Sequence, residues 1–343
     1  MTQIACVSVL IPTLNEEKFI GNCLKSIVFQ WPPEQLEIIV IDGESCDKTL
    51  DIVREFMEEY NFIKIINNPH KTVPYALNAG IRSSSGDIII RLDAHAKYDP
   101  NYISECVKEL TNGNAFNVGG PIVTQPGKKS YLGYAISYAL ACKFGVGNSK
   151  FRVAKVIGEV DTVPFGAFRR DVFEKIGFFN TNLTRNQDIE FNSRIRKNGG
   201  KIICSPNIQS TYYCRSDLKS LARQNYLTGM WSMYTTSIAA YSLSLRHYIP
   251  LIFVLSIVIS FILIPFFEGA FFILVFILAL YFSTSVFFSL NLGKRFGFKF
   301  SFVLPIVFLT LHLSRGIGSL IGLLTLKRFH RFKINEVPKS HAL

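Results

Sequence analysis

Two long stretches without a charged residue, at 248–267 and 269–292, constrain the fold of this 343-residue chain more than any other feature. Each reaches the roughly 20 residues that an α-helix needs to cross about 30 Å of hydrocarbon. Residues 1–240, in contrast, mix polar and apolar side chains as a soluble domain does. The sequence therefore predicts a soluble domain at 1–240, a membrane domain with two to three hydrophobic helices at 246–328, and a basic tail at 329–343.

The last apolar segment, residues 300–326, leaves its path through the membrane open. It contains Pro305, His312 and Arg315, and an arginine inside a membrane is costly without a partner. A full crossing would place the basic stretch 327–333 outside, against the positive-inside rule, whereas a broken or re-entrant segment would keep it inside.

The net charge of +12 does not point to nucleic acid. Much of the excess lies at 293–300 and 327–333, where the positive-inside rule and attraction to the anionic lipid bilayer explain it more simply. The N-terminus has an apolar stretch of only about seven residues, which predicts a first core strand rather than a signal peptide. The seven scattered cysteines favour reduced thiols. We therefore expect a multi-pass protein of the inner (cytoplasmic) membrane, with its soluble domain in the cytoplasm.

Strands and helices alternate along the first part of the chain. Four apolar runs predict buried strands, at residues 5–13, 36–42, 62–68 and 87–94. Segments with apolar residues at helical spacing separate them, at residues 15–30, 47–60 and 73–84. This alternation argues for a parallel sheet with helices on both faces. Ligands of such sheets lie beyond the carboxyl ends of the strands, here at 12–17, 42–47 and 93–95.

The pattern is looser further along the chain. Residues 115–126 predict one more strand, and residues 185–206 a helix followed by a strand. Residues 131–144 predict a Tyr-rich helix with a wide apolar face. This helix could belong to the core, or it could dip into the lipid headgroups beside the active site.

Taken singly, the polar residues at the strand ends are weak signals. Asp42 before a glycine is typical of a turn. Asn15 and Glu16 are well suited to open a helix, and Asp93 could cap the next one. Together on one sheet edge, however, they suggest base recognition at one end and a metal-held diphosphate at the other.

Four segments together resemble family 2 glycosyltransferases of the GT-A fold, in that family's order and spacing. They are VSVLIPTLNEEKFIGNCLKSI from residue 7, IIVIDGESCDKTLDIV from residue 38, ALNAGIRSSSGDIIIRLDAHA from residue 76 and NQDIEFNSRIRKNGGKI from residue 186. The DAHA form and the apolar C-terminal region are most similar to the succinoglycan-biosynthesis type. The resemblance implies an α/β fold with a Rossmann-like sheet, helices on both faces and C-terminal transmembrane helices.

On the donor side, the resemblance implies roles for residues at the first strand ends and on the third helix. Asp42 would accept the ring N–H of the base, usually uracil; the alternative is that it only caps a turn. Asn78 and Arg82 could approach the diphosphate, or they could only face solvent. Three residues would surround the nucleoside: Pro12, Thr13 and Glu16.

Asp93 matches the first carboxylate of the family's Asp-x-Asp signature, whose divalent metal neutralises the leaving diphosphate. His95 stands where the second carboxylate would be. A neutral imidazole still offers a ligand nitrogen and shifts the preference from Mg²⁺ towards Mn²⁺. Protonation of His95 at about pH 6 would then lower activity. The alternative is that His95 touches only the diphosphate or a water and that Asp93 alone binds the metal.

On the acceptor side, the family's Glu-Asp pair is Gln187–Asp188 in this chain. Asp188 matches the general base that takes the proton from the acceptor hydroxyl during an inverting transfer. Gln187 does not remove this chemistry, because one carboxylate suffices. Glu190 is the second candidate, although an ion pair with Arg194 one helical turn on would explain it structurally.

The family's Gln-x-x-Arg-Trp motif is incomplete, because no Arg-Trp follows Gln224. This departure argues against a processive polysaccharide synthase. Arg223, Gln224 and Trp231 could still line the acceptor or diphosphate side, and Trp231 could equally be an interfacial anchor.

The resemblance thus implies a membrane-anchored inverting glycosyltransferase for exopolysaccharide or surface-glycan synthesis. The donor would be a nucleotide-sugar, with UDP expected, and the acceptor a polyprenyl-linked or other membrane-bound glycan. One alternative is direct transfer to polyprenyl phosphate. A non-catalytic membrane scaffold is a further alternative, and the intact Asp42, Asp93 and Asp188 argue against it.

Overall fold

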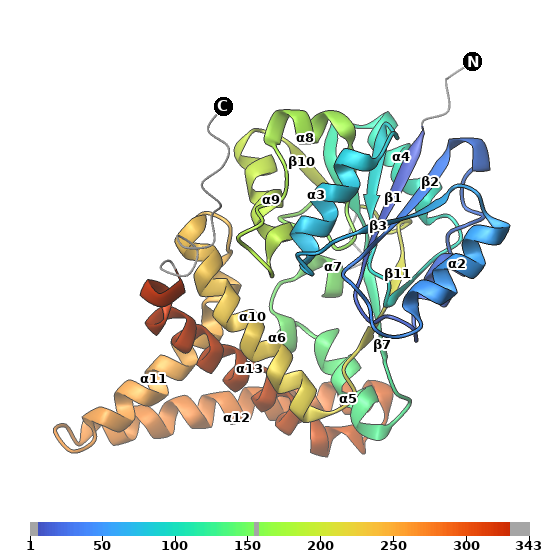
Figure 1. Ribbon diagram of the computed structural model, residues 1–343. Helices are drawn as coiled ribbons and strands as arrows, with labels where there is room; N and C mark the ends of the chain where they lie inside the picture. The colour runs from blue at the N-terminus through green and yellow to red at the C-terminus, as the bar shows by residue number, and fades with distance from the viewer. Residues whose placement is uncertain (1–5, 154–157, 330–343) are drawn as a thin grey trace. The chain divides into compact units, whose positions relative to one another are not determined.

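The computed structural model of the protein describes residues 6–153 and 158–329 and groups the chain into two compact units (Figure 1). The first unit consists of Met1–Gln125 and Ser149–Tyr213, and the second of Pro126–Asn148 and Cys214–Leu343. The domain boundary expected at residue 240 stays a prediction. All of the expected basic tail except Phe329 lies outside the described residues.

The main sheet of the first unit has eight strands in the order β3-β2-β1-β4-β9-β6-β10-β8. β1 pairs in parallel with β2 and β4, and β2 with β3, as the alternation of strands and helices predicts. β9 runs antiparallel to β4 and β6, so the sheet is mixed beyond β4 rather than parallel throughout. The strands are β1 Val7–Thr13, β2 Leu36–Asp42, β3 Ile63–Asn67, β4 Ile88–Arg91, β6 Ala115–Gly119, β8 Gly158–Glu159, β9 Ala167–Arg169 and β10 Lys201–Cys204.

Helices cover both faces of this sheet, because successive side chains of a strand point to opposite faces. In β1, Val9 and Ile11 belong to the apolar core under α1, α2 and α4, whereas Leu10 belongs to the core under α3, α8 and α9. The expected helix layers are therefore confirmed. The helices are α1 Ile20–Lys25, α2 Thr49–Glu59, α3 Val73–Ser83, α4 Tyr102–Asn112, α8 Arg170–Ile176 and α9 Gln187–Lys197, with short pieces at η1 Pro33–Gln35 and α7 Lys150–Val153.

The stretch expected to form one strand at 115–126 forms two. β6 belongs to the main sheet, and β7 (Ile122–Pro126) belongs to a three-stranded sheet in the order β5-β11-β7, with β5 at Ala96–Tyr98 and β11 at Ser210–Cys214. The chain changes sheets at Gly120, where an added Cβ would lie 1.8 Å from the carbonyl oxygen of Ile208. Only glycine permits this close approach of two backbones.

The helix expected at 15–30 is shorter than predicted, because α1 contains only six residues. Asn15 has a φ of 56°, in the left-handed region. The backbone N–H groups of Asn15 and Glu16 donate to the hydroxyls of Ser45 and Thr49, at 2.9 and 2.8 Å. These bonds to the loop after β2 and to the start of α2 take the place of the first helical turn, and they leave the Glu16 side chain in a loop.

The second unit consists mainly of helices, and its C-terminal helices are apolar. α12 and α13 are long and apolar enough to cross a membrane. α11 has 15 residues, so at about 1.5 Å per residue it is shorter than the span expected at 248–267. It ends at Leu263, two residues before Pro265, which has no backbone N–H to continue the helical hydrogen bonds. The helices are α5 Tyr131–Leu140, α6 Lys143–Val146, α10 Leu218–Ile238, η2 Leu245–His247, α11 Ile249–Leu263, α12 Gly269–Phe296 and α13 Phe300–Leu324.

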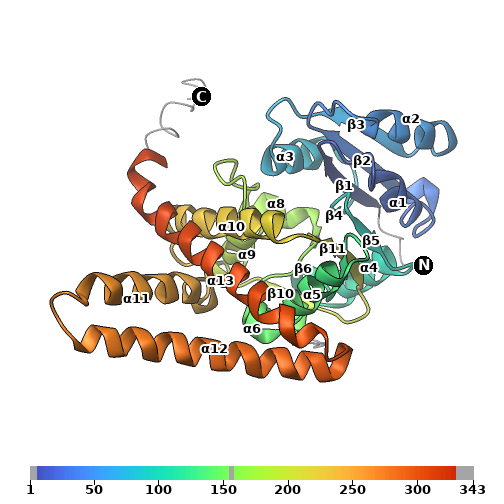
Figure 2. The same cartoon turned by 90° about the horizontal axis from the view of Figure 1, so that it is seen from below.

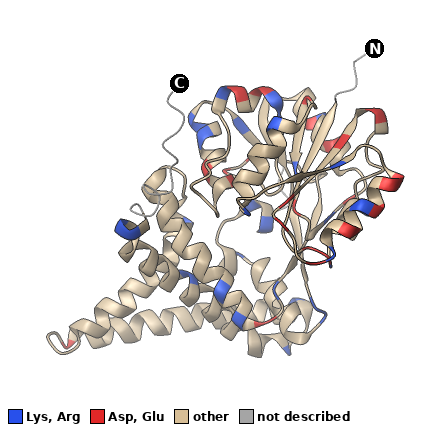
Figure 3. Cartoon of the chain, in the orientation of Figure 1, with Lys and Arg blue, Asp and Glu red and all other residues tan. Residues whose placement is uncertain are grey.

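α11 and α12 form a hairpin (Figure 2). Both helices are almost free of charged residues, as Figure 3 shows, up to Lys294 and Arg295 in the last turn of α12. Within the most apolar part of α12, only 6% of the residues are buried inside the protein. The hairpin therefore presents a long apolar surface.

The segment whose path the sequence left open forms one unbroken helix, α13, although it contains Pro305. In its apolar part 33% of the residues are buried, so α13 is packed more closely than α12. Its partner is α10. An added Cβ at Gly229 of α10 would lie 2.0 Å from the carbonyl oxygen of Arg315, so the two backbones meet where a small residue allows it.

The Tyr-rich helix α5 packs on the corner between α12 and α13. Tyr131 stacks on Phe300 with ring centroids 5.0 Å apart, and Tyr138 stacks on Phe296 at 4.0 Å. Tyr131 is still 44% exposed. α5 is thus held within the second unit by its aromatic side chains, and its contact with lipid headgroups stays a prediction.

The buried carboxylate of Glu37 links β1, β2 and β3. It lies at the edge of the sheet opposite the carboxyl ends of the strands. Glu37 of β2 accepts hydrogen bonds from the Ser8 hydroxyl at 2.7 Å and the Ser85 N–H at 3.0 Å, and Lys64 lies 2.9 Å away. Burial raises the pKa of Glu37, but these donors outweigh burial and hold the pKa below its ordinary value of 4.5. Glu37 therefore stabilises the fold in its ionised form.

We predict that Glu37→Gln lowers the free energy of unfolding by about 1–3 kcal/mol at pH 7, because a charged acceptor for three donors is lost. Since the folded-state pKa is lowered, this stabilisation is present above pH 4.5 and is lost as the pH falls below it. Thermal melting of the full chain in detergent at several pH values measures the difference. The exposed Glu55→Gln serves as control, and an equal loss for Glu37→Gln at all pH values would contradict the ionic role.

Candidate active site

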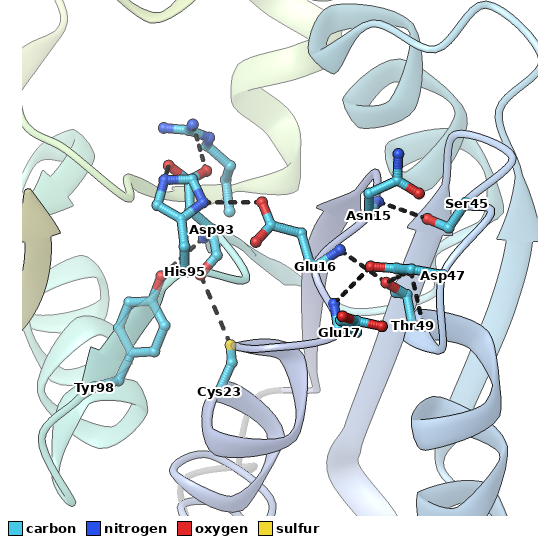
Figure 4. A network of polar contacts seen from close by, with 11 residues as sticks. Asn15, Glu16, Glu17, Cys23, Ser45, Asp47, Thr49, Asp93, His95 and Tyr98 are labelled. Atoms are coloured by element: carbon cyan, nitrogen blue, oxygen red, sulfur yellow. Dashed lines mark hydrogen bonds and ion pairs between the residues drawn. The ribbon is translucent and has the colours of Figure 1, made fainter. Parts of the chain in front are cut away.

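The loops after β1 and β2 hold each other at the carboxyl edge of the sheet (Figure 4). The Cys46 N–H donates to the side chain of Asn15 at 2.8 Å, and the Glu17 N–H donates to the Asp47 carboxylate at 3.1 Å. Asp47 also accepts from the hydroxyl of Thr49 at 2.5 Å. The two loops are therefore fixed to each other without a ligand.

Asp42, the expected base-recognising residue, lies at the end of β2 directly opposite Thr13 of β1. It is 2% exposed, and its carboxylate accepts from the Ser45 N–H at 2.9 Å, the Ser45 hydroxyl at 2.6 Å and the Thr13 hydroxyl at 3.2 Å. These bonds are those of a capped turn. Pro12 precedes this pair on β1 and is partly buried.

Asp93 lies two residues beyond β4, and its position is fixed from both sides. Its backbone N–H donates to the hydroxyl of Tyr98 at 2.8 Å, and that hydroxyl donates to the Asp93 carbonyl at 3.1 Å. Arg91, the last residue of β4, donates from Nη2 to the Asp93 Oδ1 at 2.6 Å. The other carboxylate oxygen, Oδ2, faces His95, whose Nε2 lies 4.0 Å away.

Glu16 fixes the ring of His95. The His95 Nδ1 lies 3.1 Å from the Glu16 Oε1, as Figure 4 shows. With the proton on Nδ1 donated to this carboxylate, the lone pair of neutral His95 is on Nε2, the atom that faces Asp93. A carboxylate that orients a histidine in this way is the usual companion of a metal-binding histidine. The structure thus places Glu16 against His95, and its expected place beside the nucleoside stays a prediction.

The spacing of these two ligand atoms fits a shared divalent cation. With metal bonds of about 2.1 Å, two ligand atoms of one ion are about 3.0 Å apart at a right angle and about 4.2 Å apart in a straight line. The 4.0 Å between the Asp93 Oδ2 and the His95 Nε2 lies between these two values, so a small movement of either side chain would let both atoms bind one ion. Within residues 6–153 and 158–329, no three His, Cys, Asp or Glu side chains are placed to hold an ion together. Asp93 and His95 would therefore share the ion with substrate phosphate and water.

The protonation of His95 is shifted by its neighbours. Burial lowers the pKa of His95, but the hydrogen bond with Glu16 and the negative charges of Asp93 and Glu16 outweigh burial, so that the pKa lies above its ordinary value of 6.5. Without a metal, His95 is therefore protonated at a higher pH than the sequence predicts. A cation that binds to Nε2 must displace the proton from that nitrogen.

A small pocket adjoins Asp188, the expected general base. Asp188 lies in the first turn of α9, where its Oδ1 accepts from the N–H of Ile189 at 2.8 Å. Arg91 lines the same pocket, together with Asn117 and Asn192. Arg91 thus contacts the predicted metal ligand Asp93 and shares a pocket with the predicted base.

Glu190 and Gln187, which lie near Asp188 on α9, differ from it in their hydrogen bonds. Glu190 is 4% exposed and accepts from the Arg194 Nε at 2.7 Å and Nη2 at 3.1 Å, which is the structural explanation that its spacing suggests. Gln187 is buried, and its side-chain oxygen has no hydrogen-bond partner among the described residues. These contacts favour Asp188 over Glu190 as the group free to take a proton.

Asn78 and Arg82 of α3 both contact the segment before α9, and their approach to a diphosphate stays a prediction. The side-chain amide of Asn78 is buried and bonds both the N–H and the carbonyl of Phe179, at 3.0 and 2.9 Å. Arg82 is exposed, and its guanidinium lies 4.7 Å from the ring centroid of Phe178. Their contacts are explained by holding the segment before α9, without any ligand.

Arg223, Gln224 and Trp231 all belong to α10 in the second unit. Gln224 is partly buried, as Trp231 is, whereas Arg223 is exposed. Trp231 packs edge-on against Tyr234 and Phe329, with ring centroids 5.4 and 5.8 Å apart. An aromatic cluster therefore accounts for Trp231, and its place on the acceptor side stays a prediction.

Comparison with known proteins identifies the family. Residues 8–177 match the family model described as Glycosyl transferase family 2. A protein of Methanococcus voltae named dolichyl N-acetyl-alpha-D-glucosaminyl phosphate 3-beta-D-2,3-diacetamido-2,3-dideoxy-beta-D-glucuronosyltransferase is 34% identical over 232 residues, which are 65% of this chain and 71% of that protein. The chain belongs to glycosyl transferase family 2.

Two further similarities agree with this family 2 membership. The succinoglycan biosynthesis protein ExoA of Rhizobium meliloti (strain 1021) is 26% identical over 220 residues, which are 64% of this chain and 66% of ExoA. The solved structure of the mannosyltransferase PcManGT from Pyrobaculum calidifontis, in complex with GDP-Man and Mn²⁺, is similar with a TM-score of 0.62 at 18% identity, over 94% of this chain and 88% of that chain. The second similarity concerns the fold alone and confirms the expected GT-A fold.

Sequence reasoning for this family 2 chain missed two contacts. It did not single out Arg91, although a charged residue closing the apolar run IIIRLD is a signal for a buried pair with the carboxylate that follows. It also assigned Glu16 to the nucleoside alone, because no spacing in the sequence reveals that Glu16 meets His95 across 79 residues of chain.

We predict that Glu16→Gln lowers the pKa of His95 in the metal-free protein, because a neutral amide stabilises the imidazolium less than a carboxylate does. NMR titration of carbon-labelled histidine in the full chain measures this pKa. Glu17→Gln, which alters the same loop without touching His95, is expected to leave it unchanged. A wild-type pKa at or below 6.5, or one that Glu16→Gln does not lower, would show that the Glu16 contact does not hold the proton on His95.

Proposed function

We propose that this chain is a membrane-anchored, inverting glycosyltransferase that moves a sugar from a nucleotide-sugar, with UDP the expected nucleotide, to a lipid-linked glycan. The observation that carries the proposal is the meeting of Asp93 and His95 at the sheet edge, joined through Arg91 to the pocket of Asp188. The M. voltae relative, by its name, acts on a dolichyl-linked saccharide, which supports a lipid-linked acceptor. The product would serve exopolysaccharide or surface-glycan synthesis.

Asp42 and Thr13 would form the nucleoside end of the donor site. The Asp42 carboxylate accepts three hydrogen bonds, and a carboxylate has about four acceptor positions. One position is left for the ring N–H of a uracil. The bonds from Ser45 hold this carboxylate in place, so the capped turn and base recognition are compatible roles.

Asp188 would act as the general base. In the transfer, the acceptor hydroxyl gives its proton to a carboxylate oxygen of Asp188 while the hydroxyl oxygen bonds to the anomeric carbon. The bond from that carbon to the diphosphate breaks, and its electron pair leaves with the nucleoside diphosphate. Attack on the face opposite the leaving group inverts the anomeric configuration.

Asp93 and His95 would hold a divalent cation, Mn²⁺ or Mg²⁺, which when bound stabilises the negative charge on the leaving diphosphate. Glu16 orients His95, and Arg91 orients Asp93, so that the Nε2 and Oδ2 atoms face each other. The imidazole ligand favours Mn²⁺ over Mg²⁺. The similar mannosyltransferase structure contains Mn²⁺, which supports this assignment.

The second unit would anchor the enzyme in the inner (cytoplasmic) membrane. α12 and α13 are long and apolar enough to span it, and three cations lie where the two helices meet: Lys294, Arg295 and Lys299. By the positive-inside rule this corner would lie on the cytoplasmic side, where the catalytic domain is also proposed to be. Residues of α10, among them Arg223, Gln224 and Trp231, stay proposed for the acceptor side.

We predict that Asp188→Asn lowers the rate of sugar transfer by about 10²–10⁴-fold, because an amide cannot take the acceptor proton. The assay uses the purified full chain in detergent with UDP-, GDP- and dTDP-sugars, each offered bare polyprenyl phosphate or a lipid-linked saccharide. The surface variant Asp51→Asn is the control and is expected to retain full activity. Full activity of folded Asp188→Asn would contradict the mechanism.

The two acceptor arms of the same assay separate the candidate functions. Transfer to the lipid-linked saccharide alone is expected. Transfer to bare polyprenyl phosphate alone would instead establish the alternative, in which the lipid phosphate is itself the nucleophile. Repeated addition to one acceptor would identify a processive synthase, and absence of transfer with every donor would favour a scaffold.

A further inference from the structure

The two longest apolar helices of the second unit expose their side chains in different patterns. On α12 the exposed residues include an unbroken run at 271–273, so that every side of the helix is exposed. On α13 the exposed side chains form one stripe, because they are separated by 4, 11 and 7 residues, close to whole numbers of helical turns. They are Phe302, Ile306, Ile317 and Leu324, with Leu323 beside the last.

The middle of α13 is covered by a short helix that leads directly into the first unit. Phe144 of α6 packs on the rings of Phe308 and His312, with centroids 4.9 Å apart in both pairs. The His312 Nε2 lies 2.9 Å from the Phe144 carbonyl oxygen. Only five residues after Phe144, the chain passes into the first unit at Ser149.

The C-terminal half of α13 packs on α10 (Figure 1). An added Cβ at Gly318 would lie 2.0 Å from the carbonyl oxygen of Tyr226, and one at Gly322 would lie 2.6 Å from that of Met230. Both contact positions advance by four residues, so the two helices run parallel. Counted back from Tyr226, the first residue of α10, Leu218, is level with the middle of α13.

These neighbours exclude a path of α13 straight across a bilayer. The middle of a spanning helix lies about 15 Å from either surface of the hydrocarbon. The start of α10 would be at that depth, together with the exposed charged side chains of Asp217 and Lys219. From Phe144, the rest of α6 and an extended chain to Ser149 reach only about 13 Å, so Ser149 would lie in hydrocarbon as well. Charged groups at this depth are costly.

We propose that α13 lies along the membrane surface, with its exposed apolar stripe in the acyl chains of the cytoplasmic leaflet. A helix with one apolar face occupies the interface in this way. Exposed cations at both of its ends fit anionic headgroups, and no acidic residue lies between them. These cations are Lys294, Arg295 and Lys299 before α13, and Lys327 and Arg328 after it.

The inference rests on the proposed membrane anchoring and specifies it. The hairpin of α11 and α12 enters the bilayer, and the two ends of a hairpin lie on the same side. Because α13 adds no crossing, the basic residues that follow it stay in the cytoplasm. The conflict with the positive-inside rule, which a full crossing of α13 would create, then does not arise.

The depth of spin labels in vesicles tests this inference. Labels are attached at Phe302→Cys, Ile317→Cys or Leu324→Cys in the purified full chain, with serine replacing the two exposed cysteines, Cys6 and Cys46. The protein is reconstituted in vesicles of phosphatidylethanolamine and phosphatidylglycerol. EPR power saturation with oxygen and with a nickel chelate measures the depth. All three labels are expected at the same depth, about 5–10 Å into the boundary between headgroups and acyl chains.

A spanning α13 gives a different depth profile, with the Ile317 label about 10 Å deeper than the Leu324 label, and this result would overturn the inference. Two reference labels accompany the series. Phe276→Cys on α12 is expected to lie deeper than the α13 labels, and Glu55→Cys on α2 is expected in water. Labels of α13 that lie in water, with Phe276→Cys in lipid, would also overturn the inference. If Phe276→Cys lies in water too, the membrane anchoring in the proposed function fails, whereas the sugar-transfer assay is unaffected.

A second measurement needs no reconstitution. Lys294→Cys and Lys327→Cys, which flank α13, are treated in the same serine background with a membrane-impermeant maleimide, in intact spheroplasts and after lysis. Both cysteines are expected to react only after lysis. Reaction of Lys327→Cys in intact spheroplasts would place the end of α13 outside the cell and would overturn the inference.

Discussion

Parallel pairing of β1 with β2 and β4 sends the chain out of the sheet three times at the same edge. The register places Thr13 opposite Asp42 and Leu10 opposite Arg91, so residues far apart in sequence leave the sheet side by side. The mutual hydrogen bonds of the first two loops then shorten α1 and keep Glu16 out of a helix. The contact between Glu16 and His95, and with it the orientation of the site, depends on this arrangement.

In each predicted metal ligand, one side-chain atom contacts a neighbouring residue and the other faces the second ligand. Arg91 takes the Oδ1 of Asp93, and Glu16 takes the Nδ1 of His95. The two atoms left over are 4.0 Å apart and face each other. The histidine at the second position of the Asp-x-Asp signature is therefore matched by a carboxylate behind its imidazole, and Asp93 is matched by a cation behind its carboxylate. This matching argues that the site is altered rather than lost.

Local periodicity and family motifs predicted most of the first unit. Continuous apolar runs located its main strands, which are buried on both faces, and helical spacing located its helices, which bury one face on the sheet. Local sequence patterns could not predict the hydrogen bonds and ion pairs that loop side chains form with residues far away in the sequence. They missed the shortened α1, since the bond from the Glu16 N–H reaches Thr49, the first residue of α2. They also missed the pairing of Arg91 with Asp93, because an arginine at the end of a strand can equally be exposed to solvent.

The facing nitrogen and oxygen atoms of His95 and Asp93 make one measurement decisive. Pulsed EPR of Mn²⁺ bound together with UDP to the full chain detects the nitrogen nuclei that coordinate the ion. The geometry predicts a coupling from one imidazole nitrogen in the wild type, and its loss in His95→Asp with the ion still bound. A wild-type complex that binds Mn²⁺ without any such nitrogen coupling would show that His95 is not a ligand and that Asp93 alone holds the ion on the protein side.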